Sequence, residues 1–248
     1  MISLLKNQPH YSSIFFLEQF DFINNKKYFI KSSSSPSGIM SISRELKGID
    51  WYNSKTNNVI KYEISARRKN YIRIKLAENK GSVISLSKQP YFSNIKYIDK
   101  VIDHYCLVWG CYNVSSKVPL HGDLSLLGNI IFIDNEIPVI IDWEHFNYNS
   151  VPMGFDAISF LFEILWFQIY MTNNICEHSL NHLSKTLLRL KTSNCLNQIF
   201  IDKPLKTLQE FILNNHKFWG RQIKKLPVTL FNMNQVQLID NLLLQKHD

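Results

Sequence analysis

The sequence predicts an α+β protein in which a small antiparallel sheet with one helix precedes a mainly helical region. In the first third, short runs rich in β-branched and aromatic residues are typical of strands. Beyond residue 93, apolar residues recur at the three- and four-residue spacing of half-buried helices. With 248 residues, the chain is long enough to bury a sizeable core.

The N-terminal region combines several strands with a single helix. Apolar residues at 42, 46 and 49 recur at helical spacing, so a helix is expected over 42–52. The polar stretch Ser32–Gly38 before it predicts a flexible connector. The expected strands are 14–17, 26–31, 59–65 and 71–77.

Long apolar segments predict helices in much of the remaining chain. Asp156, Glu163 and Gln168 interrupt the apolar segment 155–170, so we interpret it as a core helix and expect no transmembrane segment. The other expected helices are 93–109, 174–190, 203–219 and 232–245.

The most informative stretch is His121-Gly-Asp-Leu124, followed by Asn129 and then by Ile141-Asp-Trp-Glu144. A loop aspartate can accept a proton from a substrate hydroxyl, and an asparagine with a second aspartate supplies the oxygen ligands that Mg²⁺ prefers. Each residue alone favours a simple turn or a strand-end cap. Together, at this spacing, they indicate a phosphotransferase that uses Mg²⁺-ATP.

The residues around this stretch predict a β-hairpin. Two β-branched runs, 129–133 and 138–142, are joined by the polar turn 134–136. Asp123 precedes the hairpin and Asp142 ends it, so both carboxylates are expected at the mouth of a cleft.

This pattern resembles that of the aminoglycoside phosphotransferase and choline kinase group, whose catalytic loop begins with HGDL and ends in Asn and whose metal aspartate stands in an I-D-W-E context. The resemblance implies a bilobal protein kinase-like fold. An N-terminal ATP-binding lobe would comprise residues 1–80, and residues 81–248 would form the catalytic and acceptor-binding lobe.

By this resemblance, Asp123 is the expected catalytic base, and Asn129 and Asp142 are the expected Mg²⁺ ligands. The chain has five residues between Asp123 and Asn129 where the group has four. Either the loop bulges at Gly128, which glycine tolerates, or the metal geometry is altered. His121 is expected to brace the loop through backbone contacts rather than act as a base.

The resemblance also implies an ATP site in the first 80 residues. Lys31 ends a short strand, and Glu45 follows fourteen residues later on the expected helix, so the two are predicted to form the ion pair that holds the ATP phosphates. No G-x-G-x-x-G motif occurs, and the turn with Ser12 and Ser13 is the candidate phosphate loop. Glu78 begins the expected hinge, where backbone groups would bind adenine.

Asp156 matches a position where the group often has an aspartate that supports the catalytic loop. We interpret it as a carboxylate at a helix start that braces this loop, rather than as a metal ligand.

Charge and cysteine content add few constraints. The net charge of +8 comes from dispersed Lys and Arg with local groups only at 67–69 and 221–225, so no specific nucleic-acid partner is expected. It suits attraction of ATP or an anionic acceptor, or a basic surface without a ligand. The four cysteines lack C-x-x-C spacing, and the N-terminus is too short and polar for a secretory signal, so a cytoplasmic protein with reduced thiols is expected.

The sequence therefore predicts an ATP- and Mg²⁺-dependent kinase acting on a hydroxyl of a sugar, amino alcohol, aminoglycoside or surface-polysaccharide unit. A protein kinase-like enzyme is disfavoured, because Ser125 stands where protein kinases usually have lysine and no D-F-G or A-P-E follows. A catalytically inactive, kinase-like binding protein is the other alternative. The acceptor, the choice between ATP and GTP, and the oligomeric state are left open.

Overall fold

The computed structural model divides into two compact units. The first comprises Met1–Gly81 together with Ile141–Phe146, and the second comprises Ser82–Ile140 and Asn147–Asp248. The expected functional lobes, 1–80 and 81–248, remain a prediction. The structure describes residues 14–21, 26–57, 60–78, 81, 94–126, 128–215 and 227–244.

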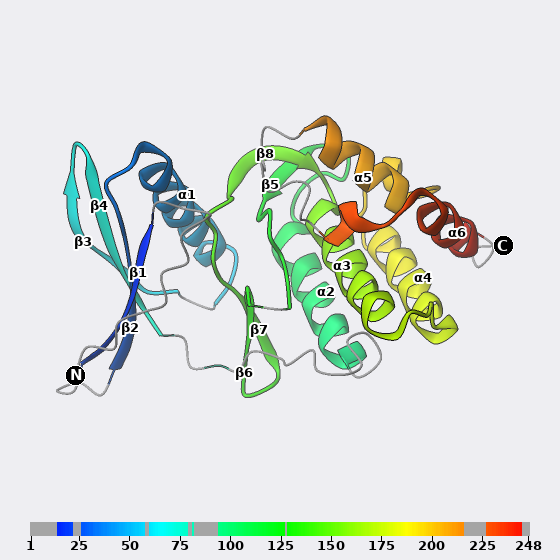
Figure 1. Ribbon diagram of the computed structural model, residues 1–248, viewed down its shortest axis with the longest axis horizontal. Coiled ribbons are helices and arrows are strands. Elements are labelled where there is room, and N and C mark those ends of the chain that lie inside the picture. The colour runs from blue at the N-terminus through cyan, green and yellow to red at the C-terminus, as the bar shows by residue number, and fades with distance from the viewer. Residues whose placement is uncertain are drawn as a thin grey trace. The chain divides into compact units, whose positions relative to one another are not determined.

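The first unit contains a four-stranded antiparallel sheet with the strand order β1-β2-β4-β3 (Figure 1). The antiparallel sheet with one helix is therefore confirmed, although the third strand begins at residue 62 rather than 59. Its elements are β1 (Phe15–Asp21), β2 (Lys26–Ser33), α1 (Pro36–Asn53), β3 (Tyr62–Arg68) and β4 (Tyr71–Ala77).

The expected flexible connector between β2 and α1 is wrong. Ser33 ends the strand and is fully buried, and Pro36 already begins the helix. The Ser35 side chain accepts a hydrogen bond from the Gly38 backbone N–H at 3.1 Å, and proline suits the first helical turn because its missing N–H has no partner there anyway. Polar composition alone did not distinguish this cap from a linker.

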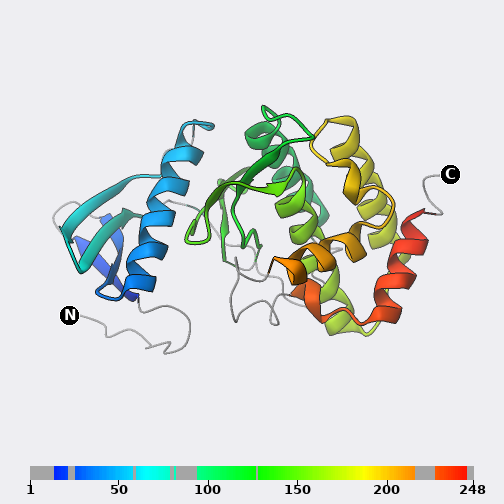
Figure 2. The same ribbon diagram turned by 90° about the horizontal axis from the view of Figure 1, so that it is seen from above.

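Helix α1 lies against one face of the sheet (Figure 2). Ile42 and Leu46 of the helix pack with Ile72 and Ile74 of β4 in one buried cluster. Lys31 is paired in register with Ile74, and residues directly opposite in an antiparallel pair share a face. The lysine is thus on the face of the sheet that α1 covers.

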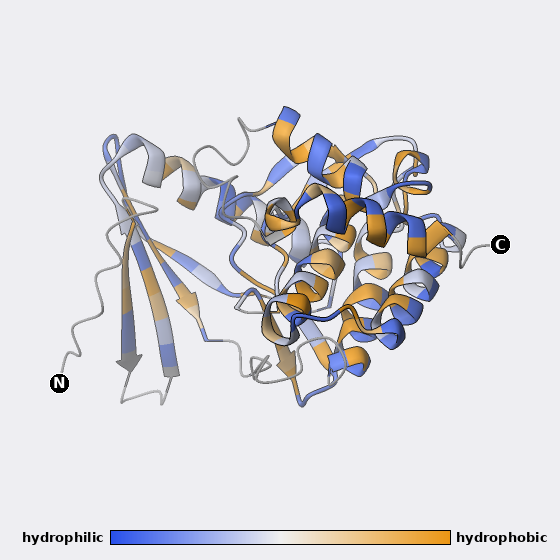
Figure 3. Cartoon of the chain, turned by 45° about the vertical axis from the view of Figure 1, so that its right-hand side comes forward, coloured by the Kyte–Doolittle hydropathy of each residue, from blue (hydrophilic) through white to orange (hydrophobic). Residues whose placement is uncertain are grey.

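The second unit is mainly helical, as predicted, with two short antiparallel strand pairs. Its helices carry both hydrophobic and hydrophilic residues, as expected where one side is buried (Figure 3). The elements are α2 (Ile95–Trp109), β5 (Lys117–Leu120), β6 (Ile130–Ile133), β7 (Ile137–Ile140), β8 (Asn147–Pro152), α3 (Phe155–Thr172), α4 (Glu177–Thr192), η2 (Gln198–Phe200), α5 (Pro204–Asn214), η4 (Pro227–Leu230) and α6 (Met233–Leu244).

The predicted hairpin is confirmed by the antiparallel pairing of β6 with β7, in which Ile130 faces Ile140. Its turn places Asp134 and Asn135 at φ values of 52° and 59°. Two successive residues with positive φ match the twist of a hairpin, and Asp and Asn tolerate this conformation better than most residues. Asn129 immediately precedes the hairpin. Asp142 follows the hairpin after one intervening residue, Ile141.

Helix α3 is long and apolar enough to cross a membrane by length and composition, alone among the helices within the described ranges. However, 61% of the tested 18-residue window is buried inside the structure. Phe160, Leu161 and Leu165 are fully buried. This burial agrees with a core helix, since length and composition are weak evidence for a membrane span.

Candidate active site

In the first unit, Lys31 lies between two carboxylates. Its Nζ donates to Glu45 Oε1 at 2.8 Å and Oε2 at 2.9 Å, and to Asp142 Oδ1 at 2.6 Å. The exposed fractions of the three side chains are 12%, 2% and 37%. The predicted pairing of Lys31 with Glu45 is present, while its role in phosphate binding stays a prediction.

The electrostatics of this cluster favour a charged lysine. Burial works to lower the pKa of Lys31, but the carboxylates of Glu45 and Asp142 outweigh burial and raise it. Burial raises the pKa of Glu45, and the Lys31 ammonium opposes that rise. The cluster therefore keeps Lys31 positively charged beside Asp142, which is the more exposed of the two carboxylates.

Within the first unit, the segment Ile141–Phe146 packs against α1 through aromatic side chains. Trp143 meets Trp51 and Tyr52 of the helix, with ring centroids 5.5 and 5.2 Å apart. Gly48 permits this approach, because a Cβ there would lie 2.5 Å from Trp143 Cβ. A glycine in a helix interior costs stability, so the close contact explains its presence.

Asp142 itself has a φ of 63°, in the left-handed region that Asp and Asn adopt more readily than most residues.

In the second unit, the loop after β5 presents Asp123 as an exposed carboxylate. Asn129 Nδ2 donates to the Asp123 backbone oxygen at 2.7 Å and to Asp123 Oδ2 at 2.8 Å. The loop therefore returns Asn129 to Asp123 despite the additional residue. Within this loop, Gly122 has a positive φ of 89°, and a Cβ at Gly128 would meet nothing within 4 Å.

Asp156 anchors the loop from the first turn of α3. Its carboxylate accepts hydrogen bonds from the backbone N–H of His121 at 2.9 Å and of Gly122 at 3.0 Å. Burial raises the pKa of Asp156 to about 6, and these two donors oppose the rise. The buried His121 ring adds a contact, since its Nδ1 accepts from the Asp123 N–H at 3.3 Å. Both supporting roles expected from the sequence agree with this geometry.

Sequence reasoning missed the link between Ser125 and Glu163. The buried Ser125 hydroxyl donates to Glu163 Oε1 at 2.7 Å, and burial raises the pKa of Glu163 to about 8. The available signal was the interval of seven residues between Asp156 and Glu163, because two helical turns return a side chain to the same side of α3.

Two aromatic pairs near these residues were also missed. Phe16 stacks on Phe29 with centroids 5.6 Å apart, and both lie on the face of the sheet that carries Lys31. On α3, Trp166 stacks on Tyr170 with centroids 5.1 Å apart, in the turns that follow Glu163. The Tyr170 side chain is 71% exposed.

Three predicted nucleotide contacts have different outcomes. Ser12 and Ser13 lie outside the described residues. The Glu78 backbone N–H donates to the Lys27 carbonyl at 3.0 Å, and its side chain lies 3.7 Å from Lys27 Nζ. The expected contact of the Glu78 backbone with adenine remains a prediction.

Magnesium binding by Asp142 and Asn129 remains a prediction. Among the described residues, no group of three or more His, Cys, Asp or Glu side chains is arranged to hold a metal. Mg²⁺ usually takes one or two carboxylates, with water and substrate phosphates completing its coordination. A larger cluster of carboxylates is therefore not required for Mg²⁺.

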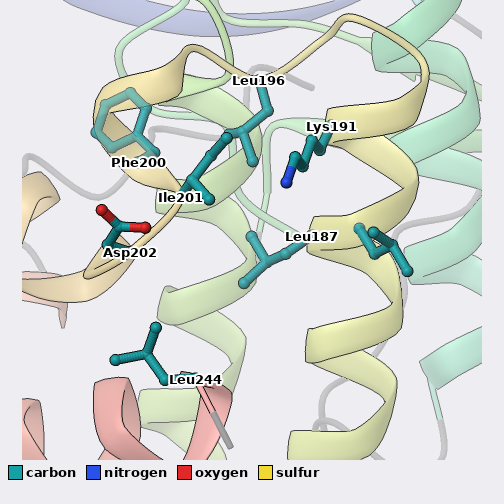
Figure 4. A pocket seen from close by; sticks show the side chains of 8 residues that line it. Leu187, Lys191, Leu196, Phe200, Ile201, Asp202 and Leu244 are labelled. Carbon is teal, nitrogen blue, oxygen red and sulfur yellow. The ribbon is translucent and has the colours of Figure 1, made fainter. Parts of the chain in front are cut away.

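A separate cavity of about 490 Å³ lies among α4, η2 and α6 of the second unit. Leu187, Leu196 and Ile201 converge on it, and Lys191 also borders it (Figure 4). It contains none of the predicted site residues.

No family model and no curated protein matches the sequence. Among solved structures, the chain is similar to the ethanolamine kinase of Plasmodium vivax, with a TM-score of 0.55 and 12% sequence identity. The match covers 94% of this chain and 79% of that one. At this identity the similarity establishes the fold alone, which is kinase-like, with an antiparallel N-terminal sheet and a mostly helical remainder.

Proposed function

We propose that this protein is a Mg²⁺-dependent phosphotransferase that moves the γ-phosphate of ATP to a hydroxyl of a small molecule. The observation that supports it most directly is the Lys31 ammonium held between Glu45 and Asp142 in a kinase-like fold. Lys31 can retain its ion pair with the buried Glu45 and exchange its contact with Asp142 for phosphate oxygens when nucleotide binds.

Each predicted residue has a distinct part in this proposal. Asp142 and Asn129, at the open end of the β6–β7 hairpin, would hold Mg²⁺. The bound ion would neutralise charge on the β- and γ-phosphates. Lys31 would contact the α- and β-phosphates while keeping its ion pair with Glu45.

Asp123 would orient the acceptor hydroxyl and receive its proton. The carboxylate is exposed, so an acceptor can reach it, and the Asn129 amide holds its Oδ2. Because phosphoryl transfer passes through a loose transition state, the proton moves late and positioning dominates. This mechanism assigns Asp123 no role in binding ATP.

Among the possible acceptors, an amino alcohol has the most support. Trp166 and Tyr170 present stacked rings on α3, and aromatic faces attract ammonium groups. The similar solved structure is that of an ethanolamine kinase, which makes ethanolamine and choline the first acceptors to try. A sugar, an aminoglycoside or a polysaccharide unit stays in the panel.

The test is Mg²⁺-dependent ATP turnover with this acceptor panel, comparing wild type, Asp123→Asn and a matched control, Asp134→Asn. Asp134 is also an exposed loop aspartate, and asparagine suits its positive φ. We expect Asp123→Asn to lower kcat by about 10²–10⁴-fold. The KM for ATP should change little, and Asp134→Asn should behave as wild type.

Acceptor-stimulated turnover that survives in Asp123→Asn would exclude Asp123 as the base. A wild type that binds ATP but phosphorylates no acceptor in the panel would instead favour the inactive, kinase-like binding protein.

A further inference from the structure

The loop that carries Asp123 is hydrogen-bonded to helix α3 on both sides of this residue. On the upstream side, Asp156 holds the backbone N–H groups of His121 and Gly122. On the downstream side, the Ser125 hydroxyl donates to Glu163. The two carboxyl groups are seven residues apart on α3, which corresponds to about 10 Å along the helix axis. One straight helix thus holds both sides of the short turn that presents Asp123.

The downstream attachment continues to Asn129. The Ser125 backbone oxygen accepts from the Asn129 N–H at 3.3 Å, and the Asn129 side chain returns to Asp123. The chain of contacts therefore runs from Glu163 through Ser125 and Asn129 to the Asp123 carboxylate. Every residue in this series lies in the second unit.

We propose that Glu163 is a positioning residue that acts through Ser125 to order the downstream half of the catalytic loop and compensates for its additional residue. An extra residue adds backbone freedom that must be lost when the loop is ordered. A buried hydrogen bond from a loop side chain to a rigid helix removes part of that freedom in advance. The consequence for turnover rests on the proposed function, whereas the ordering of the loop does not.

The chemistry of the pair explains why it can stand beside Asp123. Burial favours the neutral form of Glu163, and a neutral carboxyl adds no second negative charge near the base. A neutral acceptor is sufficient for such a bond, because the buried Ser179 hydroxyl donates to Gln168 Oε1 at the same 2.7 Å, also on α3. Glutamine at position 163 should therefore preserve the attachment.

The test compares hydrogen exchange of the amides in 121–129 and urea unfolding of the full chain for wild type, Ser125→Ala, Glu163→Ala and Glu163→Gln. Ser179→Ala is the matched control, because it removes an equivalent serine bond to the same helix. Ser125→Ala and Glu163→Ala each remove one partner of this buried hydrogen bond and leave the other unsatisfied. We therefore expect exchange in the loop to become about tenfold faster in both variants. Glu163→Gln should stay near wild type, and Ser179→Ala should change exchange only around the start of α4.

Steady-state kinetics supply the second readout. Ser125→Ala and Glu163→Ala should lower kcat by about tenfold with little change in the KM for ATP, and Glu163→Gln should restore kcat. Loop exchange in Ser125→Ala equal to that of wild type would overturn the proposal. Glu163→Gln as damaging as Glu163→Ala would also overturn it, because a charged carboxylate would then be required. If wild type phosphorylates nothing, the proposed function fails while the exchange data still decide the positioning role.

Discussion

The two units hold their chemically important side chains by different forces. In the first unit, one ammonium lies between two carboxylates, and the attraction of point charges depends little on direction. In the second, backbone N–H groups and a hydroxyl donate to carboxyl groups of one helix, and hydrogen bonds do depend on direction. The first arrangement suits groups that must change partners when nucleotide binds. The second suits a base that must stay in one place.

The strongest test of this contrast removes the central charge. Lys31→Met leaves Glu45 buried without its partner, so the free energy of unfolding should fall by about 3–5 kcal/mol in urea titrations. The control is Lys100→Met, which breaks a contact with the exposed Glu136 and should cost much less, because exposed ion pairs contribute little to stability. Equal losses in the two variants would show that burial does not strengthen the Lys31 pair.

A second test concerns the packing that places Asp142. Gly48→Ala introduces a Cβ within 2.5 Å of Trp143 Cβ, so the segment 141–146 or the helix must shift. We expect a loss of about 1–3 kcal/mol in unfolding free energy, together with reduced turnover. Gly128→Ala is the glycine control for stability alone, because its Cβ would meet nothing within 4 Å. Wild-type stability and turnover in Gly48→Ala would refute the packing argument.

A third test concerns the pH dependence of the second unit. Burial raises the folded-state pKa of Glu163 to about 8, so the folded protein retains a proton that the unfolded chain releases near pH 4.3. Its stabilising contribution is complete below that lower pH and is lost as the pH rises through about 8. Urea unfolding between pH 5 and 9 should therefore show a steeper decline for wild type than for Glu163→Gln. If the stability of wild type and of Glu163→Gln declines in parallel with pH, then Glu163 is not the group that titrates.

Much of the local structure could be predicted, because it depends on neighbouring residues. Alternating and β-branched runs predicted the hairpin after Asn129, and helical spacing predicted α1, although polar composition concealed the Ser35 cap. The ion pair of Lys31 with Glu45 was predicted through the family resemblance, from the order and distance of these residues relative to the HGDL and IDWE motifs.

What the sequence by itself determined is therefore the type of each element and the residues that bear chemical groups. Tertiary structure decided which of those groups meet. Lys31 reaches Asp142 across 111 residues, and Ser125 reaches Glu163 across 38. Periodicity shows which side of a helix is apolar, but it contains no information on which distant segment covers that side. Gly48 illustrates the limit, because a glycine inside a helix looks unfavourable until Trp143 is seen packed against it.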